Sequence, residues 1–400
     1  MLTPPAVTPS LPVTSPENVG LSTERLGRLS AKLAERVAAG HIPGASAIIV
    51  RRDKIAYQEA FGVCDPASGD KMQTDDIFRI YSMTKPIVSV AIKMLWEEGK
   101  LLLNEPVSKY IPAFADQKVL VAHNGTTEMV PVNRPATVQD LLRHTSGLTY
   151  EFRGTGPVQK AYTDARIARR DQSNEDQADM LARFPLAHQP GTAWEYSRST
   201  DVVGRLVEVI SGQTLGEFLD RRILKPLGMN ETGFFVPSDQ HGRIVQAFAK
   251  DPESGTDIAL LDVREKPQFE SGGGGLVATT MDYARFLQMM LNQGELEGVR
   301  LLGRKTVELM TSDHLGAITG APDLLTPGYG FGLGFSVRKV AGEAPMPGSI
   351  GQYYWGGAAG TTFWVDPAER LFAVLMIQAP AQREFYRVMF RDMVYAAIND

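Results

Sequence analysis

The sequence predicts an α+β fold in which one antiparallel sheet, flanked by helices, is built from the N- and C-terminal parts of the chain. Runs with strand character occur near the N-terminus and in the last quarter, whereas helical patterns dominate the middle. This order predicts an inserted helical domain. We expect a flexible tail over 1–18, an α/β domain over 19–84 and 271–400, a mostly helical domain over 85–270, and an active site between the two domains.

The first elements follow from periodicity. Leu26, Leu29, Leu33 and Val37 lie on one helical face, and Gly40 ends this helix. Two strand-like runs come next, ASAIIVRR and KIAYQEAFGV, joined by a short polar turn.

The stretch FRIYSMTKPIVSVAIKMLWEEGK predicts a buried helix from about Ser82 to Glu98. Pro86 marks its start, because proline lacks an N–H and is tolerated only in the first turn. Ser82 then lies at the positive end of the helix dipole, which stabilises a developing anion. Lys85 is three residues on and shares its face. A nucleophilic serine needs a base, and a buried lysine becomes one when its pKa falls by several units from about 10.4.

Helical and strand patterns alternate in the remaining chain. TVQDLLRHTSG predicts a helix capped by Thr137, and STDVVGRLVEVISG and TLGEFLDRRILKPLGM predict two more. Residues 272–280 are expected to return to strand character, before a capped helix in TTMDYARFLQMMLNQG. Four antiparallel strands are expected in GFGLGFSVRKV, QYYWGG, TTFWVDP and RLFAVLMIQA, and a helix over about 381–398 closes the chain.

Five motifs appear in a fixed order: SMTK at 82–85, HTSGL at 144–148, PGTAWEYS at 190–197, PLGM at 226–229 and WGG at 355–357. Together they resemble the serine β-lactamase and penicillin-binding-protein superfamily, most closely the class C β-lactamase-like esterases, or family VIII carboxylesterases. The resemblance runs from about Leu21 to the end of the chain. It implies a β-lactamase/transpeptidase-like fold. The G-x-S-x-G pentapeptide of the α/β-hydrolases is absent.

The resemblance implies a catalytic set of Ser82 as nucleophile, Lys85 as the S-x-x-K lysine and Tyr196 as the Y-x-N tyrosine. Cleavage of carboxylic esters with short acyl chains would then proceed through an acyl-enzyme on Ser82. Either Lys85 or Tyr196 can be the general base on this evidence.

The W-G-G of the esterases matches Trp355, Gly356 and Gly357. In the family, the oxyanion hole uses the backbone N–H of the nucleophile and of the residue after this motif, here Ser82 and Ala358. The three W-G-G residues are also expected to bind substrate.

Two departures from the β-lactamase pattern bear on substrate choice. The tyrosine motif reads Tyr196-Ser197-Arg198, without asparagine, and Trp355 replaces the lysine of K-T-G. That lysine helps to hold a β-lactam carboxylate, so its loss suits neutral esters. Arg198 is a substitute cation that would permit weak β-lactamase activity.

Aromatic residues near the motifs are candidates for the acyl pocket, with core packing as the alternative for each: Tyr150, Phe152, Trp194, Tyr353 and Tyr354. His144 is expected to be a structural histidine bonded to backbone. Asp140 is interpreted as a helix-start residue.

Three alternatives stay open: a β-lactamase or D-alanyl peptidase, an acyltransferase that passes the acyl group to an alcohol, and a catalytically inactive scaffold. Trp355 disfavours the first. The second differs from hydrolysis only in the acceptor. Retention of Ser82, Lys85 and Tyr196 disfavours the third.

The bulk properties limit partners. The net charge is -5, and the nearest thing to a basic cluster, at 166–170, is interpreted as a solvated face, so no nucleic acid is expected.

The one cysteine, Cys64, excludes an internal disulfide and is expected to be buried and inert. Neither a signal peptide nor an apolar run of membrane-spanning length is found, which predicts a cytoplasmic protein with no membrane partner. We expect a small-molecule ester substrate, no cofactor and no metal, with the oligomeric state open.

Overall fold

The computed structural model describes residues 10–123, 126–319 and 324–400. The helices are α1 (Thr23–Ala38), α2 (Thr84–Glu97), α3 (Val138–Leu142), α4 (Pro157–Asp164), α5 (Asn174–Arg183), α6 (Ser199–Ser211), α7 (Leu215–Leu219), α8 (Lys225–Leu227), α9 (Thr280–Leu291), α10 (Arg304–Met310) and α11 (Arg383–Ala396). The strands are β1 (Gly44–Arg51), β2 (Lys54–Asp65), β3 (Asp70–Lys71), β4 (Phe78–Arg79), β5 (Lys118–His123), β6 (Thr126–Pro131), β7 (Val277–Ala278), β8 (Glu295–Leu296), β9 (Val299–Arg300), β10 (Tyr329–Phe331), β11 (Ser336–Arg338), β12 (Tyr353–Gly356), β13 (Thr362–Asp366) and β14 (Leu371–Ile377).

The main sheet joins the two ends of the chain, as expected. Its strand order is β10-β11-β12-β13-β14-β1-β2-β3, and every pairing in it is antiparallel. The junction is the β1–β14 pair, in which Ala45 lies opposite Ile377 and Arg51 opposite Leu371. The predicted α+β class, with a sheet built from both ends, is therefore confirmed.

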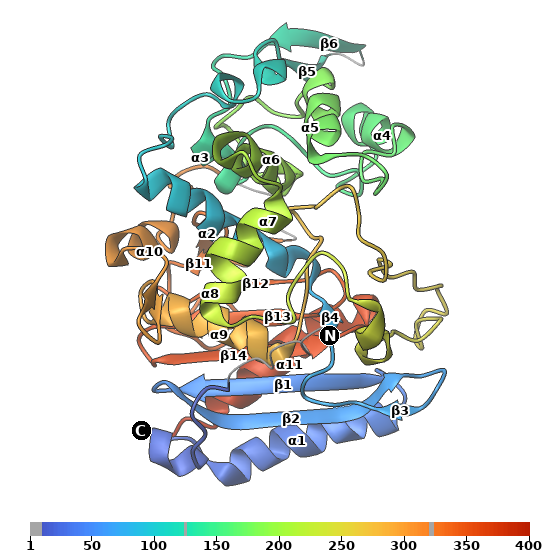
Figure 1. Ribbon diagram of the computed structural model, residues 1–400, viewed down its shortest axis with the longest axis vertical. Helices are drawn as coiled ribbons and strands as arrows, with labels where there is room; N and C mark the ends of the chain where they lie inside the picture. The colour runs from blue at the N-terminus through green and yellow to red at the C-terminus, as the bar shows by residue number, and fades with distance from the viewer. Residues whose placement is uncertain (1–9, 124–125, 320–323) are drawn as a thin grey trace, which may run out of the picture.

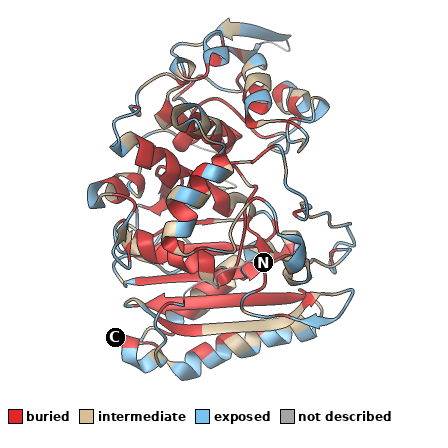
Figure 2. Cartoon of the chain, in the orientation of Figure 1, coloured by how far each residue is buried: buried red, intermediate tan, exposed pale blue. Residues whose placement is uncertain are grey.

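Helices cover both faces of this sheet (Figure 1). Alternate residues of β14 belong to different apolar clusters, because side chains in a strand point to opposite faces. Leu371, Ala373 and Leu375 pack with α1 and α11, whereas Phe372 and Val374 pack on the other side, with α2 and α9. Both faces of β1 and β14 are consequently buried (Figure 2).

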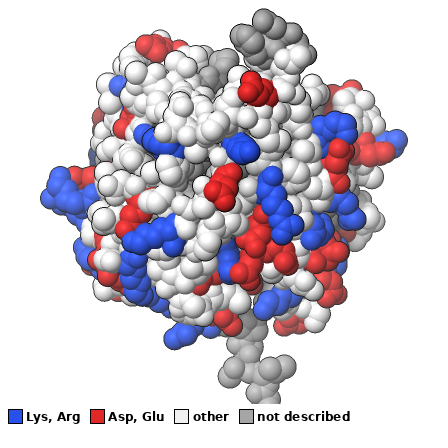
Figure 3. Space-filling view, turned by 90° about the horizontal axis from the view of Figure 1, so that it is seen from above, with Lys and Arg blue, Asp and Glu red and all other residues white. Residues whose placement is uncertain are grey.

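The chain from β5 to α6 forms the upper part of Figure 1, whereas α8 lies beside the sheet. Helix α2 runs from the sheet into this part, and its residues from Thr84 to Leu95 are all buried. On the face seen from above, Lys and Arg side chains are interspersed with Asp and Glu (Figure 3). Among the described residues, no helix combines the length and apolar character that crossing a membrane requires.

Three local expectations need correction. Within the expected flexible tail, the segment at 12–14 is bonded to β2, where Thr14 N donates to Ile55 O at 2.9 Å, and Pro16–Val19 forms a 3₁₀ turn; residues 1–9 lie outside the described residues. The predicted strand at 272–280 is only the two residues of β7, because the glycines before it form a turn. The helix expected over 214–229 is interrupted by a π-helical turn at 220–224, just before Pro226, which cannot donate a helical hydrogen bond.

The hairpin β5–β6 has no counterpart in the predicted elements. The described residues of β6 are mostly exposed, so the strand lacks the apolar–polar alternation that marks a half-buried strand.

Thr137 caps α3 as predicted, and Asp140 completes a capping box. The Asp140 carboxylate is fully buried and accepts hydrogen bonds from Arg134 Nη1 at 2.5 Å, Arg143 Nη2 at 3.0 Å and Thr145 Oγ1 at 2.8 Å. Burial raises the pKa of Asp140, but these hydrogen bonds outweigh it and hold the pKa well below the usual range. Asp140 therefore has a structural role.

We predict that Asp140→Ala lowers the free energy of unfolding by about 3 kcal/mol, since it removes a buried carboxylate that accepts charge-assisted hydrogen bonds from Arg134 and Arg143 and leaves the buried Thr145 hydroxyl without its acceptor. Because the folded-state pKa is depressed, the wild-type advantage is complete above about pH 5 and shrinks as the pH falls. Urea unfolding followed by circular dichroism measures the loss of unfolding free energy at pH 7 and its decrease at pH 3. The matched control is Asp164→Ala, whose exposed i,i+4 pair with Lys160 is worth less than about 0.5 kcal/mol. Equal losses in the two variants would contradict the prediction.

Candidate active site

Ser82 lies in a 3₁₀ turn, Tyr81–Met83, directly before α2 begins at Thr84. Pro86 is the third residue of α2, within the first turn as the sequence predicts. The turn begins with a tight bend, since its first residue, Tyr81, has φ of 44°, a left-handed value that is unusual for a non-glycine residue. The Tyr81 hydroxyl accepts a hydrogen bond from Leu261 N at 2.9 Å, which holds this residue in place.

The Lys85 amine is fully buried and has three polar contacts. Its Nζ lies 2.6 Å from Gly273 O, 3.0 Å from Tyr150 Oη and 3.2 Å from Ser82 Oγ. A carbonyl oxygen only accepts, so one N–H must point to Gly273. A neutral amine has one further N–H for Tyr150, which leaves its lone pair for the Ser82 hydroxyl. The three contacts are therefore compatible with a neutral Lys85 that accepts the proton of Ser82.

Burial lowers the pKa of Lys85 to about 7. The negative charge of Asp201 opposes this shift, and the positive charge of Arg198 reinforces it. An amine with this pKa is largely neutral in mildly alkaline solution, without loss of the fold.

Tyr196 reaches the site because two loops are hydrogen-bonded to each other. Glu195 N donates to His144 O at 2.9 Å, and Arg198 N donates to Thr149 O at 3.2 Å. The Tyr196 ring lies over the Lys85 amine, with Nζ 4.5 Å from the ring centroid, and Trp355 Nε1 donates to its hydroxyl at 3.3 Å.

Burial raises the pKa of Tyr196 to about 12, although hydrogen bonds with Ser82 and Trp355 act in the opposite direction. Tyr196 is therefore a neutral phenol at pH 7, able to pass a proton but a poor source of phenolate. The Tyr150 hydroxyl, whose pKa burial raises well above 10, is neutral as well.

Strand β12 brings Ala358 to Ser82 by an unusually close approach. A Cβ on Gly357 would lie 2.5 Å from Ile80 O and 2.2 Å from Thr361 Oγ1, so only glycine fits between β12 and the segment that leads to Ser82. Among the described residues, no hydrogen-bond acceptor pairs with the backbone N–H of Ser82 or Ala358. Both residues line one cavity. The oxyanion hole expected from the sequence at these two amides stays a prediction.

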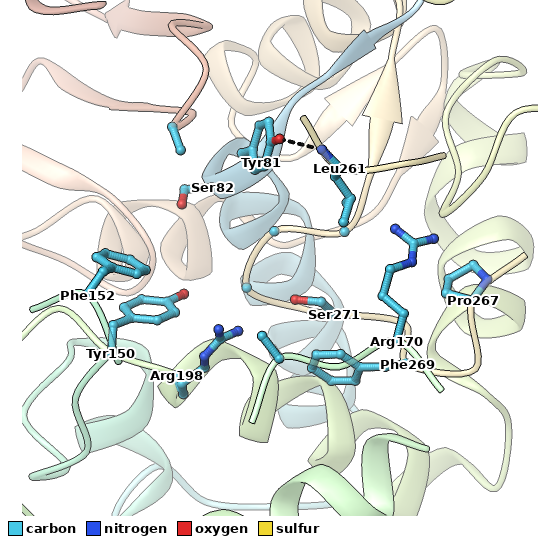
Figure 4. A pocket seen from close by; sticks show the side chains of 15 residues that line it. Tyr81, Ser82, Tyr150, Phe152, Arg170, Arg198, Leu261, Pro267, Phe269 and Ser271 are labelled. Atoms are coloured by element: carbon cyan, nitrogen blue, oxygen red, sulfur yellow. Dashed lines mark hydrogen bonds between the residues drawn. The ribbon is translucent and has the colours of Figure 1, made fainter. Parts of the chain in front are cut away.

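This cavity has a volume of about 270 Å³ and is drawn in Figure 4. Its lining is mostly apolar and carries two arginines: Tyr81, Ser82, Tyr150, Phe152, Ala168, Arg170, Arg198, Leu261, Pro267, Phe269, Ser271, Gly273, Gly274, Gly275 and Ala358. The rings of Tyr150 and Phe152 stack with centroids 4.6 Å apart.

The other residues expected to bind substrate do not line this cavity. Trp194 is 1% exposed and packs against Tyr196 and Phe331 in the aromatic core beneath the site. Trp355 is also buried, with its ring centroid 5.2 Å from that of Tyr196, and Gly356 and Gly357 position the strand. An apolar ring therefore occupies the position that the β-lactamase resemblance assigns to a lysine.

The expectation that Arg198 is a free cation for a substrate carboxylate also needs correction. Its guanidinium is paired with Glu151 and, at 3.2 Å, with Asp201, so its charge is already balanced. The sequence offered no signal for Asp201, which also accepts hydrogen bonds from Ser271 Oγ at 2.6 Å and Gly273 N at 2.8 Å. Asp201 thereby holds the loop whose carbonyl binds Lys85.

His144 is structural, but its ring contacts a side chain instead of backbone: Nδ1 lies 3.1 Å from Ser197 Oγ. Burial lowers the pKa of His144 well below 6.5, so the ring is neutral. Cys64 is buried, as expected, and burial raises its pKa to about 12. Across residues 10–123, 126–319 and 324–400, no group of three His, Cys, Asp or Glu side chains has metal-ligating geometry.

Comparison with known proteins gives concordant results. The family model described as Beta-lactamase matches residues 29–397. Protein Rv1367c of Mycobacterium tuberculosis is 36% identical over 360 residues, which cover 87% of this chain and 88% of the relative. Esterase EstB of Burkholderia gladioli is 30% identical over 391 residues, covering 92% and 95%.

The fold is shared with solved structures. That of EstCE1, a hydrolase with promiscuous acyltransferase activity, superposes with a TM-score of 0.76 at 24% identity, and the match covers 93% of this chain and 99% of EstCE1.

We predict that Gly357→Ala slows phosphonylation of Ser82 by a p-nitrophenyl phosphonate by about 100-fold, because the added methyl group separates Ala358 from Ser82. Intact-mass spectrometry follows the labelling. Gly27→Ala is the matched control, since a Cβ at Gly27 in α1 meets nothing within 4 Å. Labelling at the wild-type rate in a folded Gly357→Ala protein would contradict the predicted close approach.

Proposed function

Because the chain belongs to the β-lactamase family, we propose that it is a serine hydrolase of carboxylic esters with short acyl chains, acting through an acyl-enzyme on Ser82. Its relatedness to an esterase over nearly its whole length supports the reaction class. The single observation that carries the proposal is the buried Lys85 amine at hydrogen-bonding distance from Ser82 Oγ.

In acylation, Ser82 Oγ bonds to the ester carbonyl carbon and its proton moves to Lys85 Nζ. The carbonyl oxygen becomes an oxyanion between the amides of Ser82 and Ala358. The bond to the alcohol oxygen then breaks, and the proton returns to that oxygen through the Tyr196 hydroxyl. Lys85 is the base in this scheme because its pKa lies near 7, whereas that of Tyr196 lies near 12.

In deacylation, a water oxygen bonds to the acyl carbon and gives one proton to the Tyr196 and Lys85 pair. The bond between the acyl carbon and Ser82 Oγ breaks, and Ser82 regains a proton. The products are the carboxylic acid and the enzyme in its starting state, so atoms and charge balance over the cycle.

Acyl transfer to an alcohol is the second candidate, because an alcohol can replace water in deacylation with no other change. EstCE1, a hydrolase with promiscuous acyltransferase activity, combines both activities in one protein of this fold. β-Lactamase or D-alanyl peptidase activity has less support, since Trp355 is buried and apolar and Arg198 is balanced by Glu151 and Asp201. The arginine beside β12, Arg387, donates to Gly357 O at 2.6 Å and pairs with Glu384 at 2.8 Å.

The decisive test is hydrolysis of p-nitrophenyl butyrate by the wild type and by Ser82→Ala. We expect turnover by the wild type and a loss of at least about 1,000-fold in the variant, because the covalent route is removed. Equal activity in the two proteins would exclude Ser82 as nucleophile. An inactive wild type would favour the scaffold alternative or a narrow acyltransferase, and product analysis with added alcohol separates these two.

The pH dependence tests the assignment of the base. We expect kcat/KM of the wild type to rise as the pH passes through about 7, because Lys85 must lose its proton. Asp201→Asn removes the negative charge that raises the Lys85 pKa, so the rising limb should move to lower pH. Asp164→Asn, with its charge on the surface, should leave the limb in place. A limb that stays or moves to higher pH in Asp201→Asn would reject Lys85 as the base.

A further inference from the structure

The charged residues that line the cavity next to Ser82 are all positive. Its lining includes the guanidinium groups of Arg170 and Arg198 and no carboxylate. Arg198 is balanced by Glu151 and Asp201, which lie behind the cavity wall. The remaining positive charge is that of Arg170.

Arg170 has no counter-ion within ion-pair distance in the part of the chain that the structure describes. Its Nη2 donates a weak hydrogen bond to Glu265 O at 3.4 Å, and the carboxylate that acts on it electrostatically, Asp262, pairs with Arg264 at 3.5 Å. The Arg170 side chain is half-buried, and burial lowers its pKa. Arg170 is therefore a partly desolvated cation, unlike the solvated residue expected from the sequence.

The position of Arg170 is fixed by its backbone. The amides of Gln268 and Phe269 donate to Arg170 O at 3.2 and 3.3 Å. This links Arg170 to the segment that continues into Gly273 and so to the Lys85 amine. In Figure 4, Arg170 lies across the cavity from Ser82, beyond Ser271.

The position of the cavity relative to Tyr196 indicates which part of an ester enters it. A leaving alcohol must depart beside its proton donor, Tyr196, and neither Tyr196 nor Trp355 lines the cavity. The group that enters from Ser82 toward Arg170 is therefore the one that stays bonded to Ser82 in the acyl-enzyme. It passes an apolar wall that includes Leu261 and Phe269 and ends at a guanidinium.

Resting on the ester hydrolysis proposed above, we propose that Arg170 is a specificity-determining residue that binds a carboxylate at the far end of the acyl group. The preferred substrates are then half-esters of short dicarboxylic acids, which present a carboxylate, an apolar chain and an ester carbonyl in that order. A guanidinium matches a carboxylate by two parallel N–H donors, which an apolar acyl end cannot use.

The test compares p-nitrophenyl half-esters of succinate, glutarate and adipate with neutral p-nitrophenyl esters of the same acyl length, such as pentanoate for glutarate. The measured quantity is the ratio of kcat/KM for the half-ester to that for its neutral partner, at pH 8 and low ionic strength. Arg170→Met should lower this ratio at least about tenfold for the preferred length, the cost of losing a charge-assisted hydrogen bond. Arg170→Lys, which keeps the charge, should retain the greater part.

The matched control is Arg169→Met, because Arg169 is the adjacent arginine, pairs with Asp171 at 3.5 Å and does not line the cavity. Its ratio should stay within about twofold of the wild type, as for a surface charge. The assignment of Arg170 would be overturned if this ratio fell less than tenfold in Arg170→Met, or fell equally in Arg169→Met. Normal turnover of the pentanoate ester in that case would leave the proposed ester hydrolysis intact. A wild type that hydrolyses neither ester would overturn the proposed function and this inference together.

Discussion

The burial of the Lys85 amine is the constraint on which the rest of the site depends. A charged ammonium in an apolar interior is costly unless it is paired or loses its proton. Within the described part of the chain, no carboxylate bonds to this amine; its partners are a carbonyl, a phenol and the Ser82 hydroxyl. The pKa near 7 follows from this environment. The fold thus supplies a neutral amine beside a serine, and its apolar packing makes the chemistry possible.

The surroundings of Lys85 can be understood as supports for that burial. Asp201 acts on Lys85 through Gly273. The Asp201 carboxylate accepts a hydrogen bond from the Gly273 amide, and the Gly273 carbonyl accepts one from Lys85. Arg198 pairs with Asp201, so the two opposite charges act on the pKa of Lys85 in opposite directions. On the opposite side, the missing side chain of Gly357 lets β12 approach Ile80, which brings Ala358 to Ser82. The contact of Asp201 with Gly273 and the close approach of Gly357 to Ile80 therefore bring the helices and the sheet together at Ser82.

Two arginines line one cavity and differ in what surrounds them. Arg198 is tied to Glu151 and Asp201 and acts as part of the wall. Arg170 lies among apolar groups, with its backbone bound by the 268–269 segment. An apolar cavity that ends in an unbalanced cation selects ligands by charge as well as by length, because the cation is already partly desolvated before any ligand arrives.

The sequence by itself determined whatever depends on neighbours along the chain. Periodicity predicted α2 and most strands of the sheet, although the one strand expected in GFGLGFSVRKV is the hairpin of β10 and β11. Pro86 located the first turn of α2 beside Ser82, because helical and strand spacing and the missing proline N–H are local properties. Only the tertiary structure decided which distant residues meet. The contact of Tyr150 with Lys85, the hydrogen bond of Asp201 with Gly273 and that of Arg170 with Phe269 join residues separated by 65, 72 and 99 positions in the chain. A single tyrosine, aspartate or arginine carries no local sign of such a contact, since its environment is created by packing.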